Sequence, residues 1–228
     1  MGIALQNFTK DESLSGIWEI NESEDALLKL CKLTEYDKIL INDSGSKQRR
    51  IELLAVRALL HTLNPEITIQ YDNRKPICNK GYISISHSDK YAAIVWHPEK
   101  QPTLDIEHIN DRILRIAKRA FNDDELEFAN DNTQSLTTIW SCKECVYKIA
   151  NIQGLDFKKQ IFVSDFTRVE KDYISSLPSY SRCLVNHKRT QDTNTKSIHC
   201  LLKLENKQIK FELNRKLIDN HVLIWGLF

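Results

Sequence analysis

Helical and strand-like segments recur along the whole chain, and this pattern constrains the possible folds most strongly. Between Lys47 and Leu63, apolar residues recur at intervals of three and four, as on the buried face of an amphipathic helix, namely at Ile51, Leu54, Ala55, Ala58 and Leu59. Further helices are expected at 24–33, 111–121, 123–130 and 134–151. Strands are expected at 17–20, 67–71, 82–86, 91–96, 104–107, 160–163, 181–185, 197–204, 208–213 and 221–228. Helices followed by strands therefore occur in both halves, although inspection demonstrates no internal repeat.

Length and composition indicate a globular protein. The 228 residues suffice for one large domain or two small ones, and a hydrophobic content of 41% supplies a core. Residues 97–102 contain two prolines and several charges, and a junction there predicts domains at 1–100 and 101–228. Six glycines argue against phosphate-binding loops of the P-loop and Rossmann kinds. A formal net charge of +1 argues against nucleic-acid binding, which usually shows as a strong basic excess.

The sequence also predicts a compartment. The N-terminus lacks the basic segment and apolar run of a signal peptide, and no stretch approaches the roughly 18 apolar residues of a membrane span. The six cysteines are irregularly spaced in a protein that is not small, so a disulfide framework is not expected. We therefore expect a cytoplasmic protein with free thiols.

Two acidic residues in one expected strand form the first candidate site. Asp105 and Glu107 are separated by a single residue, so their side chains point to the same face of the strand. Two converging carboxylates attract a hard divalent cation, and Mg²⁺ in turn recruits phosphates. The alternative is the solvated face of an edge strand, and the Asp-x-Glu spacing by itself leaves that alternative open.

The helix expected over 134–151 carries a second group of charged residues. Glu144 could complete a set of metal ligands, and Lys148, one turn later, could contact an anionic oxygen. The same two residues are also spaced for a surface ion pair, which would need no ligand. Lys143 falls in the middle of the buried side of this helix. Such a break in the apolar pattern marks either a functional site or a lysine whose ammonium reaches solvent or a structural carboxylate.

Other candidate residues have both a structural and a functional interpretation. His87 ends an expected strand rich in hydroxyl groups and could donate to a phosphate oxygen, although single histidines are more often structural. Arg50 and Arg57 are seven apart on one flank of their helix, which is either a plain polar flank or a source of bidentate phosphate contacts. Cys142 and Cys145 lie in the middle of a helix with no second pair at metal spacing, which argues against zinc and redox chemistry.

Three stretches follow one another at a characteristic spacing: Arg74-Lys75-Pro76 with Ile83 to Ser88, then Thr103 to Glu107, then Trp140 to Lys148. In order and spacing they resemble the motifs of the 4′-phosphopantetheinyl transferases, specifically the larger single-chain type that activates surfactin synthetase. The similarity spans residues 47–165. Two glycines of the family pattern are replaced, by Arg74 and Thr103. Threonine resists some backbone conformations that glycine accepts, but neither change removes a charged group.

The resemblance implies an α+β fold of two similar subdomains, packed as an intramolecular pseudodimer with the active site in the cleft between them. It implies that Mg²⁺ is held against the pyrophosphate of coenzyme A by Asp105, Glu107 and Glu144. It also implies that the phosphates of coenzyme A are contacted by Lys75, Ser86, His87 and Lys148, with Arg50 as an additional helper. Lys143 would support the site.

The resemblance further implies a transfer reaction. A serine hydroxyl of an apo acyl or peptidyl carrier protein attacks the β-phosphorus of coenzyme A, the 4′-phosphopantetheine arm moves to the serine, and 3′,5′-ADP leaves. Lys148 and His87 would neutralise the developing charge, and Glu144 would act as general base, directly or through a bound water. The expected setting is a cytoplasmic monomer that serves the biosynthesis of fatty acids, polyketides or nonribosomal peptides.

Two other functions remain open on the sequence. One is a non-catalytic module that kept the fold and binds coenzyme A or a nucleotide. Three acidic residues argue against it, because binding alone does not need three metal ligands. The other is a Mg²⁺-dependent phosphohydrolase, which would release phosphopantetheine or phosphate into solution without any carrier protein.

Overall fold

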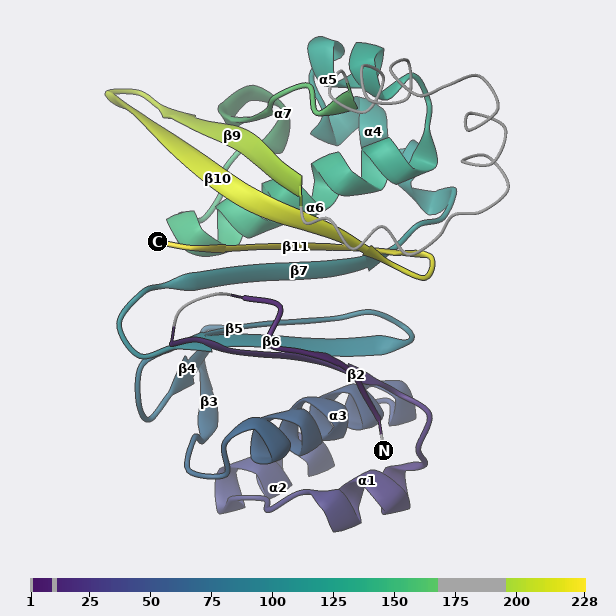
Figure 1. Ribbon diagram of the computed structural model, residues 1–228, viewed down its shortest axis with the longest axis vertical. Helices are drawn as coiled ribbons and strands as arrows, with labels where there is room; N and C mark the ends of the chain where they lie inside the picture. Colours follow the sequence, from purple (N-terminus) through teal and green to yellow (C-terminus); the bar gives the residue numbers. More distant parts are fainter. Residues whose placement is uncertain (1, 10–11, 168–195) are drawn as a thin grey trace, which may run out of the picture. The chain divides into compact units, whose positions relative to one another are not determined.

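The computed structural model describes residues 2–9, 12–167 and 196–228. The chain divides into two compact units, residues 1–106 with 227–228 and residues 107–226. Each unit combines helices with a sheet of antiparallel strand pairs, so the expected α+β class is confirmed (Figure 1). The strand expected over 181–185 lies outside the described residues.

The first unit is built on a four-stranded sheet with the order β1-β2-β6-β5. These strands are β1 (Ile3–Gln6), β2 (Leu14–Glu19), β5 (Tyr82–His87) and β6 (Tyr91–His97). The helices are α1 (Glu24–Leu30), α2 (Glu35–Asn42) and α3 (Lys47–Leu63), and they precede a hairpin of β3 (Ile69–Asp72) and β4 (Lys75–Cys78). Helix α3 packs against β2 and β6 on one face of the sheet (Figure 1). Its apolar side chains belong to the core of this unit.

Helix α3 begins and ends at the residues that the apolar pattern predicts. Its N-cap is Ser46, whose hydroxyl accepts a hydrogen bond from the backbone N–H of Arg49. Sequence reasoning missed the shorter helix α2, which begins with a capping box between Thr34 and Asp37. Arg57 Nε of α3 donates to Asp37 Oδ1 over 2.6 Å, and both side chains are buried. Arg57 is therefore a buried residue paired with Asp37, and not part of the plain polar flank that the sequence suggested.

The turn between β3 and β4 contains one of the two departures from the family pattern. Asn73 and Arg74 have φ angles of 47° and 72°, and a two-residue hairpin turn of type I′ needs positive φ at both central residues. Glycine is the usual occupant of such a position because a Cβ atom is strained there. Arg74 therefore stands where this backbone favours glycine. Thr103 lies in a strand and is not among the described residues with positive φ, so threonine fits its backbone without that strain.

The second unit contains a sheet with the order β7-β11-β10-β9-β8, and the division between the units falls within β7. Its strands are β7 (Pro102–His108), β8 (Ile161–Val163), β9 (Lys196–Leu204), β10 (Lys207–Ile218) and β11 (His221–Leu227). Its helices are α4 (Arg112–Ala120), α5 (Asp123–Ala129), α6 (Thr133–Ala150) and α7 (Phe157–Gln160). Helix α6 packs against α4, α5, β8 and β9. It ends at Ala150, and Asn151, whose backbone is left-handed, is its C-cap, so the helix ends before Gly154.

A charged residue lies at the centre of the second unit's core. The Lys143 side chain is fully buried, and its Nζ lies 2.7 Å from Glu125 Oε2. The same Nζ donates to the carbonyl oxygens of Ala120, Phe157 and Ile161 over 3.1, 2.7 and 2.7 Å. Burial lowers the pKa of Lys143 and raises the pKa of Glu125, and the ion pair opposes both shifts. The ammonium thus reaches a structural carboxylate, which is one of the interpretations that the sequence left open.

Candidate functional site

The first unit brings Asp105, a predicted metal ligand, into contact with Ser86, a residue predicted to bind phosphate. Ser86, on β5, donates its hydroxyl hydrogen to Asp105 Oδ1 over 3.1 Å and accepts a hydrogen bond from the backbone N–H of Ile106 over 3.2 Å. Asp105 and Ser86 are both buried. Because a buried carboxylate needs polar partners, the serine hydroxyl both stabilises Asp105 and fixes the direction of its side chain.

His87 belongs to a different cluster, because neighbouring residues of a strand point to opposite faces of the sheet. Its Nε2 lies 2.6 Å from Arg49 Nη1, and its Nδ1 lies 3.4 Å from Glu52 Oε2. The guanidinium also contacts Glu52 directly, with 3.2 Å between Arg49 Nη1 and Glu52 Oε2. Sequence analysis missed Arg49 and Glu52 as site candidates. The only signal was the group of arginines at the start of this helix, which does not indicate which of them faces His87.

The two remaining candidates of the first unit have different surroundings. Arg50 forms a two-point ion pair with Glu24 of α1, with Nε and Nη2 at 2.7 and 3.2 Å from its carboxylate oxygens. The hydrogen bond from Arg50 lowers the pKa of Glu24, and the same bond raises the pKa of the guanidinium. Lys75 begins β4 with an exposed side chain. Arg50 thus pairs with Glu24, whereas Arg49 of the same helix contacts His87.

In the second unit, a tryptophan connects Glu107 to the helix that carries Glu144. Trp140 Nε1 donates to Glu107 Oε1 over 3.3 Å. On α6, Trp140 lies four residues before Glu144, and Lys148 lies four residues after it, so the three side chains follow one face of the helix. The contact therefore places the Glu107 carboxylate beside the face of α6 that carries Glu144. Glu107, Glu144 and Lys148 are all partly exposed.

Helix α4 presents a strongly basic surface. Its buried face consists of Ile113, Ala117 and Ala120, and its exposed side chains include Arg112, Arg115, Lys118 and Arg119. Leu114 lies among these cations with 42% of its surface exposed. Because the chain as a whole carries a net charge of only +1, this helix concentrates positive charge on one part of the second unit.

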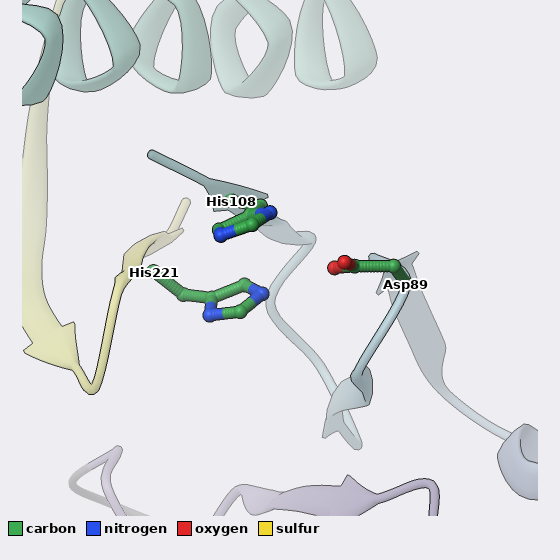
Figure 2. A group of neighbouring side chains, drawn as sticks. All are labelled: Asp89, His108 and His221. Atoms are coloured by element: carbon green, nitrogen blue, oxygen red, sulfur yellow. The ribbon is translucent and has the colours of Figure 1, made fainter. Parts of the chain in front are cut away.

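Two histidines lie face to face at one end of the second unit's sheet. The rings of His108 and His221 stack with centroids 4.8 Å apart and planes inclined by 16° (Figure 2). Asn220 joins this corner, because its side-chain nitrogen donates to the Ile109 carbonyl over 2.8 Å and lies 3.2 Å from His108 Nε2. These contacts connect the end of β7 to the start of β11. Asp89, also labelled in Figure 2, belongs to the first unit and lies on the bend between β5 and β6.

The cysteines of the described residues are free thiols, as expected, and those of α6 are deeply buried. Burial raises the pKa of the Cys142 thiol well above its ordinary value, and neighbouring Cys200 and Cys145 act in the same direction. Cys145 Sγ donates to the Ile224 carbonyl over 3.6 Å. The thiolate is the form that binds metals and attacks disulfides. The pair Cys142 and Cys145 is therefore suited to neither role.

We expect Cys142 and Cys145 to resist alkylation by iodoacetamide in the native protein and to react once the chain is unfolded in urea. The reason is that neither thiol reaches solvent, and that burial raises the pKa of the Cys142 thiol. Mass spectrometry of tryptic peptides measures the labelling of each cysteine separately. Cys31 provides an internal comparison. Burial raises its pKa too, to about 12, but unlike Cys142 it is partly exposed. Fast native labelling of Cys142 would contradict the structure.

Comparison with protein families gives a match to one segment of the chain. The family model of the 4′-phosphopantetheinyl transferase superfamily matches residues 103–200. The matched segment begins in β7 and includes all of α6, so it contains Asp105, Glu107, Glu144 and Lys148. A search of curated proteins gave no match. Residues 103–200 are therefore similar to that transferase superfamily, whose members use coenzyme A as a substrate. Within the described residues, no helix has the length and apolar character needed to cross a membrane.

Proposed function

We propose that the protein transfers the 4′-phosphopantetheine arm of coenzyme A to a serine of an apo acyl or peptidyl carrier protein and releases 3′,5′-ADP. The observation that carries the proposal is the superfamily match over the segment that contains Asp105, Glu107 and Glu144. The motifs in the first half of the chain favour the larger single-chain type of this enzyme. We propose that it works as a cytoplasmic monomer in fatty-acid, polyketide or nonribosomal-peptide biosynthesis.

The acidic residues fit a magnesium ion. Asp105 and Glu107 leave the same face of one strand, and the contact of Glu107 with Trp140 lies one helical turn from Glu144. Carboxylate oxygens are the ligands that Mg²⁺ prefers in proteins. We therefore propose that these three side chains hold the ion. When bound, it would neutralise negative charge on the pyrophosphate of coenzyme A.

Basic side chains would hold the phosphates of the co-substrate. We propose that Lys75 and Lys148 contribute ammonium groups and that His87 and Ser86 contribute ring and hydroxyl donors. Arg50 is already engaged by Glu24, as described above. The adjacent contact of Arg49 with His87 favours Arg49 as a further phosphate-binding arginine. These charges would be present before the reaction, which is how a preorganised site stabilises a developing charge.

Proton transfer completes the reaction. A bond forms between the serine oxygen of the carrier and the β-phosphorus, and the bond from that phosphorus to the bridging oxygen of 3′,5′-ADP breaks. The serine must lose its proton as the new bond forms, and we propose that Glu144 accepts it. Lys148, one turn along α6, would stabilise the negative charge on the departing phosphate.

The basic face of α4 is the proposed docking surface for the carrier. Carrier proteins of these pathways are usually acidic, and complementary charge both speeds encounter and orients the partner. Arg112, Arg115 and Arg119 lie on the exposed side of the helix, and the exposed Leu114 adds an apolar contact among them. This arrangement suits a partner with acidic and apolar side chains on one helix.

Reversing charge on α4 should weaken the binding of the carrier protein and leave the binding of coenzyme A unchanged. In the double variant Arg115→Glu/Arg119→Glu, we expect the KM for the carrier to rise by about tenfold or more, because two attractive contacts become repulsive. The KM for coenzyme A should stay within about twofold in steady-state assays. Lys207→Glu, a charge reversal at the exposed start of β10, is the control. An unchanged KM for the carrier would exclude α4 as the docking surface.

One experiment tests the proposed function against its alternatives. The protein is incubated with coenzyme A and Mg²⁺, with and without a panel of apo carrier proteins, and the products are weighed by mass spectrometry. A carrier that gains the mass of the phosphopantetheine arm, with 3′,5′-ADP in the supernatant, supports the transferase. Release of phosphopantetheine or phosphate without any carrier supports a phosphohydrolase instead. Binding of coenzyme A with no product in any mixture supports a non-catalytic module.

A further inference from the structure

We infer that Glu52 is a positioning residue, which holds Arg49 and His87 side by side and so prepares them to bind one phosphate group. The inference rests on the proposed function, because the anion concerned is a phosphate of coenzyme A. Glu52 itself carries negative charge and would not touch that anion. It acts through Arg49 and His87, the two basic side chains that its carboxylate contacts.

The contacts of Glu52 use both of its carboxylate oxygens. Oε2 lies 3.2 Å from Arg49 Nη1 and 3.4 Å from His87 Nδ1, and Oε1 accepts a hydrogen bond from Gln48 Nε2 over 3.3 Å. Only 14% of the Glu52 side chain is exposed, against 43% for Arg49 and 34% for His87. The carboxylate is therefore the sheltered member of the cluster, and the two basic groups face the solvent from which a ligand arrives.

The contact between Arg49 and His87 determines the tautomer of the histidine. A guanidinium group has donors and no acceptor, so His87 Nε2 must accept the hydrogen bond from Arg49 Nη1 over 2.6 Å. The ring hydrogen of the neutral imidazole therefore resides on Nδ1, which faces Glu52 Oε2. The carboxylate thus orients the ring through one nitrogen, and the guanidinium occupies the other nitrogen.

This arrangement suits an incoming phosphate oxygen. The anion can replace His87 Nε2 as the acceptor of the Arg49 hydrogen bond, because a charged oxygen is a stronger acceptor than an imidazole nitrogen. Once Nε2 is released and takes up a proton from solvent, it can donate to the same anion. Glu52 would hold both side chains in place during the exchange. An arginine held in this way loses less conformational freedom on binding than a free one, so the carboxylate strengthens ligand binding without touching the ligand.

The Glu52→Gln variant tests the inference by kinetics. The amide keeps the size of the side chain and its place on α3, but it removes the charge. We expect the KM for coenzyme A to rise about tenfold, while kcat stays within about threefold of the wild-type value. The matched control is Glu35→Gln, which removes another glutamate that pairs with a basic residue three positions along its helix, Lys38. An unchanged KM for coenzyme A in Glu52→Gln would overturn the inference.

A variant cycle separates positioning from a general loss of stability. In a protein that already carries Arg49→Gln and His87→Asn, the further change Glu52→Gln should alter the KM by less than about twofold. A tenfold effect in that background would show that Glu52 acts independently of the two residues, and the inference would be wrong.

Nuclear magnetic resonance provides a readout that does not depend on catalysis. In the ligand-free wild-type protein at alkaline pH, ¹⁵N shifts should show the ring hydrogen of His87 on Nδ1, and the Arg49→Gln/Glu52→Gln variant should lose this preference. A ring hydrogen on Nε2 in the wild-type protein would reject the arrangement. If no carrier protein is modified in any mixture, the proposed function fails, whereas the tautomer still tests the positioning by itself.

Discussion

The Glu144→Gln variant is expected to lose about 10²–10³-fold in kcat for phosphopantetheine transfer while remaining folded. Glutamine preserves the size of the side chain and the helical structure of α6. It removes the negative charge that would attract a divalent cation and the group that would accept the serine proton. Because Glu144 is only partly buried, we expect the variant to remain folded. The rate at which a fluorescent pantetheine arm is transferred to an apo carrier measures the effect.

The control for this variant is Glu127→Gln, which removes an exposed glutamate from the neighbouring helix α5. It should keep wild-type activity. The variant Asp105→Ala should also abolish transfer, although it removes the acceptor of the Ser86 hydrogen bond as well, so Glu144→Gln is the cleaner test. Turnover at the wild-type rate by either variant would reject the proposed metal site.

The Lys143→Met variant should lower the free energy of unfolding by about 3–5 kcal/mol. Methionine fills most of the space of the lysine stem but removes the ammonium. The Glu125 carboxylate would then be buried without its cation, and three carbonyl oxygens would lose a donor. Breaking a buried pair in this way costs more than the pair itself contributes, because the remaining charge is uncompensated. Urea denaturation followed by circular dichroism measures the change.

A double variant shows whether the uncompensated charge is the cause. Lys143→Met/Glu125→Leu removes both charges and should regain much of the lost stability. Recovery should be incomplete, because Glu125 also accepts hydrogen bonds from the backbone N–H groups of Asn122 and Val163. A loss below about 1 kcal/mol in Lys143→Met would contradict the role assigned to this pair. Lys143 adjoins Glu144 on α6, so this pair also anchors the part of the helix that carries the proposed base.

The elements predicted most accurately are those in which local periodicity and burial agree. Helix α3 has the predicted bounds because a single face of apolar residues recurs over more than four turns. Helix α2 was missed because it is only eight residues long, and its Thr34–Asp37 capping box was the signal that could have revealed it. The strand expected at 160–163 is shorter in the structure, because Phe157–Gln160 form a short helix before it.

For the candidate site, sequence reasoning identified the types of residues better than their partners. The alternation of a strand and the turn of a helix are local rules, so they predict which acidic side chains share a face. They do not predict that Ser86 contacts Asp105 or that Trp140 contacts Glu107, because each of these contacts joins residues far apart in the chain. The choice between neighbouring arginines depends in the same way on packing.

The sequence by itself determined the α+β class, the length of α3 and α6, and the acidic and basic residues that suggest phosphate chemistry. Only the tertiary structure decided that Arg49 contacts His87 while Arg50 pairs with Glu24, and that Lys143 is a core residue paired with Glu125. The physical reason is that periodicity depends on neighbours along the chain, whereas a charged side chain finds its partner across elements that hydrophobic burial has brought together.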